Sequence, residues 1–291
     1  MLKLLKLSLF VILGQLALVV SSYASGPSFA VASFTGFNAL DQVARNAGGA
    51  SNGNSFSSQA TQGVGSSGNW SYWADVAYHD IDFGNFGPIS GSSGVDAAFG
   101  IENALSPFVT VGVSFTHQDY DEIFADTRSK IVSPYVNLTF APGYELIAIY
   151  GIGSVNQSQT NLSWDSAAYM LQLNVGDFAI GQAEVVPFLS YSHKSDEIFP
   201  MFEPSFAREM IGVDVDIPLE QWLLELRLGF SSLSVEINNI PQPLSDNNGL
   251  VASFGASKMM GTGVFSASLG FQESIGESNA TSFSINYQRP F

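Results

Sequence analysis

The segment "IGVDVDIPLEQWLLELRLG", from Ile211 to Gly229, contains two runs in which apolar residues alternate with polar or small ones. In the first run one face carries Ile211, Val213, Val215 and Ile217. In the second run one face carries Trp222, Leu224, Leu226 and Leu228. A period of two residues places successive side chains on opposite faces of a β-strand. The segment therefore predicts two amphipathic strands that are joined at Glu220 and Gln221.

A two-residue turn at this junction would also fix how the two strands pair. Ile217 would then face Leu224 on the apolar side, and Asp214 would face Arg227 on the polar side. Cross-strand neighbours stabilise a sheet when they match in this way, and a slip of one residue would exchange the two faces. We therefore expect an antiparallel hairpin with one apolar face and one polar face.

The same alternation recurs about twelve times between Trp70 and the last residue. We expect strands near 70–83, 94–105, 108–119, 129–141, 144–156, 165–176, 183–194, 208–218, 222–236, 248–259, 263–274 and 280–291. Their polar faces carry mostly Ser, Gly, Thr and Asn, whereas a soluble sandwich would present many Lys and Glu residues to water. Together with 46% hydrophobic and 12% charged residues, this pattern predicts an all-β protein. The expected fold is a closed antiparallel transmembrane β-barrel of about 12 strands with a short N-terminal linker or helix.

The connections between these strands alternate between short and long. "PGY" near Pro142 and "LEQ" near Glu220 are short, whereas "NQSQTNLSWDS" and "SDEIFPMFEPSFA" are long. Outer-membrane barrels have short periplasmic turns and longer outer loops. An even number of strands would place both ends of the barrel at the periplasmic side. The last strand would then pair with the first, which leaves no open edge in lipid.

The N-terminal region predicts secretion and a linker. In the first 24 residues two lysines precede an apolar stretch that ends in small residues, which is the pattern of a cleaved signal peptide. An uncleaved anchor helix is the alternative. Residues 25–68 are predicted to be a linker, in which 35–47 has the spacing of a helix that could plug the lumen. A disordered leader is the other interpretation of that segment. The barrel is expected to occupy residues 69–291.

Charge and cysteine content exclude several functions. The formal net charge is −16, so we expect no nucleic-acid partner that would be held through its phosphates. The chain has no cysteine, which excludes thiol catalysis and cysteine-ligated metals.

Two quoted segments give the barrel a family resemblance. A tryptophan-rich first strand, "NWSYWADVAYHDIDF", follows the linker, and the chain ends with "FSINYQRPF". With about twelve strands between them, residues 69–291 resemble the translocator (β) domain of autotransporter outer-membrane proteins. The resemblance implies a protein of the Gram-negative cell outer membrane, which is delivered by periplasmic chaperones and inserted by the barrel-assembly machinery.

The resemblance also implies that the assembly machinery reads the last strand. The candidate assembly-signal residues are Phe283, Ile285, Tyr287 and Phe291. This sequence departs from the usual signal, because Arg289 stands where an apolar residue is expected. We also expect no long passenger of the kind that the family usually carries, since only a short segment separates the predicted signal peptide from the barrel.

We expect no catalytic, cofactor or metal site. His79, His117 and His193 are far apart in the sequence, and Ser192 and His193 are neighbours that point to opposite faces of a strand. Several acids are expected in outer loops, where they are solvated or bind divalent ions: Asp119, Asp121, Glu122, Asp126, Asp196 and Glu197.

The lumen is predicted to be acidic. Its candidate residues are Asp96, Glu102, Asp214, Asp216, Glu225 and Arg227. They would pair across strands or favour cations along any open path.

The first functional hypothesis is a structural or translocation role, in a monomer surrounded by outer-membrane lipid and lipopolysaccharide. The alternatives are a small porin for cations or neutral solutes, and a surface adhesin whose loop would expose Phe199, Met201, Phe202 and Phe206.

Overall fold

The computed structural model describes one helix and fourteen strands. It covers residues 27–47, 70–82, 91–121, 126–141, 143–158, 161–198, 203–238, 240–241, 248–273 and 279–290, with side chains of the helix from Gly36 onward. The elements are α2 (Pro27–Asn46), β1 (Trp70–Asp82), β2 (Ser92–Ser106), β3 (Val109–Asp121), β4 (Thr127–Ala141), β5 (Tyr144–Gln157), β6 (Leu162–Val175), β7 (Phe178–Ile180), β8 (Ala183–Glu197), β9 (Pro204–Leu219), β10 (Trp222–Ile237), β11 (Ile240–Pro241), β12 (Asn248–Met260), β13 (Gly263–Glu273) and β14 (Asn279–Pro290). Among the described residues, no helix is both long enough and apolar enough to cross a membrane.

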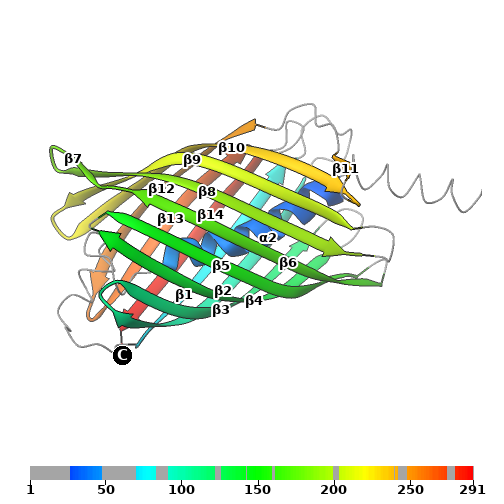
Figure 1. Cartoon of the computed structure of the whole chain (residues 1–291), viewed down its shortest axis with the longest axis horizontal. Coiled ribbons are helices and arrows are strands. Elements are labelled where there is room, and N and C mark those ends of the chain that lie inside the picture. Colours follow the sequence, from blue (N-terminus) through cyan, green and yellow to red (C-terminus); the bar gives the residue numbers. More distant parts are fainter. Residues whose placement is uncertain are drawn as a thin grey trace, which may run out of the picture.

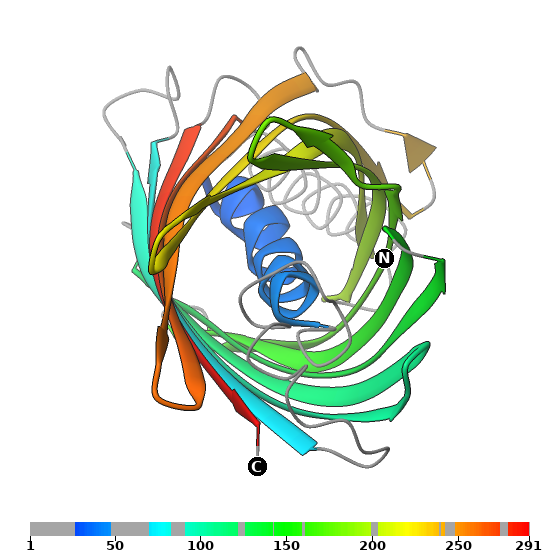
Figure 2. The same cartoon turned by 90° about the vertical axis from the view of Figure 1, so that its left-hand side faces the viewer.

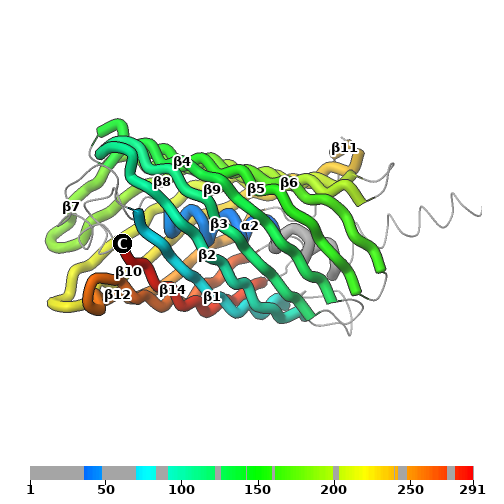
Figure 3. Tube along the Cα trace, turned by 90° about the horizontal axis from the view of Figure 1, so that it is seen from below, coloured from blue at the N-terminus to red at the C-terminus, as the bar shows by residue number. Residues whose placement is uncertain are grey.

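Twelve long strands of the described chain close into one antiparallel barrel. Each pairs with its neighbour in sequence once the two short strands β7 and β11 are set aside, and β14 returns to pair with β1. Figure 3 shows this seam, where β14 runs beside β1. The seam is continuous from Ser71 opposite Pro290 to Asp82 opposite Asn279. The predicted fold class is therefore confirmed.

The short turns lie at one end of the barrel, which we call the short-turn end, and the long connections lie at the other, the long-loop end (Figure 1). β1 begins and β14 finishes at the short-turn end. The predicted hairpin of β9 and β10 is confirmed, because Ile217 pairs with Leu224 and Asp214 pairs with Arg227. Glu220 adopts a positive φ of 52° in the turn between them. A two-residue turn fixes the register of its two strands locally, which explains why the sequence alone predicted this pairing.

Three features differ from the sequence-based expectations. The predicted turn near Gly176 instead extends into β7, which pairs with the start of β8 and projects beyond the rim. β8 and β9 also run further toward the long-loop end than expected. Asp196 therefore lies in β8 and Phe206 in β9, and both side chains are buried inside the barrel instead of lying in a loop.

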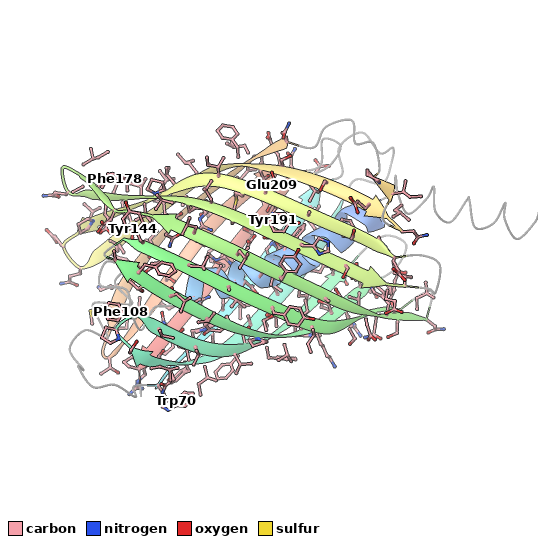
Figure 4. All side chains as sticks on the ribbon, in the orientation of Figure 1. Trp70, Phe108, Tyr144, Phe178, Tyr191 and Glu209 are labelled. Carbon is pink, nitrogen blue, oxygen red and sulfur yellow. The ribbon has the colours of Figure 1, made fainter. Side chains whose placement is uncertain are left out.

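The exterior of the barrel is apolar. The exposed side chains include Val76, Phe99, Phe115, Ile152, Leu171, Ile211, Phe254 and Leu269, from strands around the whole ring. Figure 4 places Trp70, Phe108, Tyr144 and Phe178 at the short-turn end, where exposed aromatic side chains form a rim. An apolar band with an aromatic girdle is the surface that lipid requires. The long strands therefore cross a membrane, with their polar faces turned inward.

We predict that the two faces of the wall respond differently to a new charge. Val213→Arg, which would face lipid, should lower the free energy of unfolding by roughly 2–4 kcal/mol near mid-membrane. Ser253→Arg, which would face the acidic lumen, should lower it much less. Urea unfolding of the barrel in lipid vesicles, followed by tryptophan fluorescence, measures both. An equal or larger loss for Ser253→Arg would mean that the assigned faces are reversed.

Candidate functional site: the lumen and its helix

Helix α2 lies inside the barrel (Figure 2). The helix expected at 35–47 is present, but it begins earlier, at Pro27, and its last helical residue is Asn46. Asn38 contacts Tyr120 at the long-loop end of β3, whereas Asn46 contacts Asn286 in the half of β14 that leads to the short-turn end. The helix therefore runs from the long-loop end toward the short-turn end.

One face of α2 packs against an apolar section of the inner wall. Leu40 and Val43 are fully buried. The cluster they join consists of Ala44, Ala47, Trp73, Ala98, Tyr135, Ile147, Ile149, Ala168 and Met170. These wall residues come from β1, β2, β4, β5 and β6, so the helix lies against that half of the barrel. Burial of this face is the main attraction that holds an amphipathic helix in place.

A buried ion pair holds α2 at the edge of its apolar face. Both Asp41 carboxylate oxygens accept hydrogen bonds from the Arg208 guanidinium, at 2.6 and 3.0 Å. The Arg208 side chain is 2% exposed, and its guanidinium also lies 4.8 Å from the centre of the Phe37 ring. A two-pronged Arg–carboxylate pair is strong and directional. Sequence reasoning missed this pair, because 167 residues separate its members.

Three amides of the helix add hydrogen bonds to the wall. Asn38 donates to the Tyr120 hydroxyl at 3.1 Å, and Gln42 donates to Asp75 at 3.2 Å. Asn46 accepts from the Asn286 side chain at 2.6 Å. Their spacing of four residues places them on one face of a helix, which was the only sequence signal for this role.

A second buried ion pair lies beside the N-terminal half of the helix. Lys194 and Asp196, both from β8, are 2.6 Å apart, and their side chains are at most 1% exposed. The Lys194 chain passes directly over Gly36. A Cβ atom at that position would overlap Lys194, so any larger residue there would have to displace the Lys194 side chain.

Asp96 and Glu102, two of the predicted lumen residues, are fully buried and lie at the centres of hydrogen-bond networks. Asp96 accepts from Gln118 at 3.1 Å and from Tyr120 at 3.2 Å, and His79 lies 3.1 Å away. Because Tyr120 also holds Asn38, this network links the wall to the helix.

The Glu102 network ties the barrel seam together. Its carboxylate accepts from Ser71 of β1, Tyr135 of β4 and Gln288 of β14, at 2.9, 3.1 and 3.2 Å. Tyr135 in turn accepts a hydrogen bond from Trp73 at 3.0 Å. The arrangement is structural, since each donor belongs to the wall and both carboxylate oxygens accept hydrogen bonds.

The four remaining predicted lumen residues lie together toward the short-turn end. Arg227 donates to both oxygens of Asp214, at 2.7 and 2.8 Å, and Glu225 accepts from Ser257 at 2.7 Å. Asp216 is the cross-strand neighbour of Glu225. These four residues line a cavity beside the helix.

Three of the candidate assembly-signal residues lie on the outer face of the seam. Phe283, Ile285 and Tyr287 are opposite Tyr78, Val76 and Ala74 of β1. Phe291 lies outside the described residues. This outward placement fits contact with lipid. Recognition of these residues by an assembly factor stays a prediction.

The histidines do not meet. His79 lies in the lumen, whereas His117 and His193 are on strands whose alternation turns them outward, and Ser192 points inward. Within the described ranges, no cluster of three or more His, Cys, Asp or Glu side chains could hold a metal ion.

Of the acids expected in outer loops, Asp119 lies in β3 and pairs with Arg128 at 3.1 Å. Glu122 lies outside the described residues.

No protein-family model matches this sequence, and no curated protein sequence matches it either. Solved structures do match the fold. The translocator domain of the autotransporter NalP from Neisseria meningitidis aligns with a TM-score of 0.54 at 12% identity, and the alignment covers 80% of this chain and 92% of that one. The β domain of the Bordetella autotransporter BrkA aligns with a TM-score of 0.57 at 12% identity, and the alignment covers 78% and 100%.

An outer-membrane channel from Pseudomonas putida F1 is about as similar. It aligns with a TM-score of 0.54 at 11% identity, and the alignment covers 78% of this chain and 96% of that one. At such identity the likeness concerns the fold, and both translocators and channels use it. The chain has the fold of the outer-membrane β-barrels, which it shares with the translocator domains of autotransporters.

Proposed function

We propose that this chain is a translocator-type barrel of the outer membrane, in which α2 carries the chain through the lumen and then stays there as a plug. Its role would be structural and translocating, without an enzyme site. The observation that carries the proposal is the direction of the helix. Its N-terminal half lies at the long-loop end, although β1, which follows it in sequence, begins at the short-turn end.

That direction is the one expected after transport of a segment that precedes the barrel. With short turns on the periplasmic side, the N-terminal end of α2 points toward the outer side, as transport through the lumen would leave it. The two buried polar contacts of Asp41 and Asn38 then retain the helix. A cleaved signal peptide and insertion by the assembly machinery belong to the same proposal.

The alternative channel role has some support from the fold, since a Pseudomonas putida channel shares it. The packed helix and the Arg208–Asp41 pair argue against a wide path through the intact barrel. The adhesin hypothesis loses part of its basis, because Phe206 is buried inside the barrel. Phe199, Met201 and Phe202 lie outside the described residues.

We predict that the intact protein is electrically closed in planar lipid bilayers. Deletion of residues 27–47 should produce a steady, cation-preferring conductance, because it removes the helix and leaves the acidic wall. A barrel that carries Val76→Leu on its lipid face serves as a control and should stay closed. A steady pore in the intact protein would contradict the plugged translocator and favour the channel.

We also predict that Asp41→Ala loosens the helix. Removing one partner of a buried ion pair costs about 3–5 kcal/mol, because it leaves Arg208 buried without its counter-ion. Hydrogen exchange of the α2 amides should therefore become much faster, while the barrel strands stay protected. The double variant Asp41→Leu/Arg208→Met should restore much of the protection. Unchanged exchange in Asp41→Ala would mean that the pair does not retain the helix.

A further inference from the structure

The helix leaves one side of the lumen unfilled. α2 packs mainly against β1–β6 and β8. Beside its C-terminal end is a cavity of about 570 Å³, which reaches to the turn residues Phe108 and Gly143 and therefore to the short-turn end. The far wall is built from β9, β10 and β12–β14, and it presents small hydroxyl side chains such as Ser253 and Ser268. This volume is typical of small-ligand sites.

The lining of the cavity is strongly acidic. It includes seven carboxylates and only two guanidinium groups, those of Arg45 and Arg227. Glu184, Asp216 and Glu225 form a row across β8, β9 and β10, because Asp216 is the register partner of both other residues. Like charges that are directly opposite on neighbouring strands repel one another. A bound cation would relieve this repulsion.

One amide group in the lining independently offers an acceptor to a ligand. Gln172 is 3% exposed and lines the cavity, and its carbonyl oxygen Oε1 has no hydrogen-bond partner among the described residues. Its amide nitrogen donates to Asn174 at 3.0 Å, and the Asn174 nitrogen donates to Glu145 at 3.2 Å. Each of the two amide nitrogens thus already donates within the wall. A buried acceptor without a partner is costly, so this site favours a ligand rich in N–H donors.

The helix already places one cation in this cavity. Arg45 is exposed within it and lines it together with Asp75 and Glu225. The cavity therefore accommodates a guanidinium at its inner end. From Arg45, the row of Glu184, Asp216 and Glu225 lies in the direction of the short turn between β9 and β10.

We propose that this cavity binds an extended organic cation that carries two or more primary ammonium groups, of the polyamine class. An ammonium group donates three hydrogen bonds, which suits the carboxylate, hydroxyl and amide oxygens of the lining. A single metal ion fits less well, because the carboxylates of the described residues do not converge in a group of three. The inference does not rest on the proposed translocating role.

The test is calorimetric titration of spermidine into the folded full chain in detergent micelles at low salt. We expect saturable binding of one equivalent. The double variant Asp216→Asn/Glu225→Gln should weaken it about tenfold, since two attractive charges are lost. Arg45→Ala should tighten binding severalfold, because it removes the competing cation. That gain of affinity would not follow from damage to the fold, and faster migration of unboiled protein on a gel verifies folding of each variant.

The matched control is Asp80→Asn/Asp82→Asn, which removes the same charge from the exterior of β1 at the long-loop end. It should leave the affinity unchanged. The proposal is overturned if spermidine does not saturate, or if the control weakens binding as much as the cavity variant. It is also overturned if Mg²⁺ at equal ionic strength competes equally well, because binding would then be general screening of an acidic protein. Unchanged or weaker binding by Arg45→Ala would likewise contradict the assigned site.

Discussion

The rest of the structure depends on the pairing of β14 with β1. Lipid offers no hydrogen-bond partner, so every backbone amide and carbonyl of a membrane-crossing strand needs another strand. The seam meets this need along almost the full length of both strands. Glu102 reinforces it from inside, because the carboxylate binds side chains from both β1 and β14. Once the ring is closed, the direction of every side chain is decided, outward to lipid or inward to the lumen.

Closure creates an interior that must be filled or solvated. The described part of the chain fills one side with its own helix. Leu40 and Val43 supply apolar contact, and Asp41 supplies an ion pair with Arg208. Buried ion pairs add little net stability compared with apolar residues of the same size, but a missing partner is costly. The pair therefore acts mainly to fix where the helix lies, since any displaced position would leave Arg208 without its counter-ion.

The two sides of the lumen consequently have different chemistry. Beside the helix the acids are tied to donors of the wall, as Glu102 is to Ser71, Tyr135 and Gln288. On the far side small serines replace bulky residues, and the acids of β8–β10 surround open volume. A plug and a cation-binding cavity are thus compatible in one barrel, because the helix occupies only part of its cross-section.

The sequence by itself determined the strands, their faces and one hairpin register. A strand repeats every two residues and a short turn is local, so Asp214 opposite Arg227 was readable from the sequence around Glu220. Tertiary structure alone decided which distant residues meet inside the ring. Asp196 and Phe206 were misplaced in a loop, because only the pairing of Asp196 with β6 and of Phe206 with β8 shows how far these strands continue. The helix contacts, such as Asp41 with Arg208, depend on the stagger of the closed barrel, which is a property of all twelve strands together.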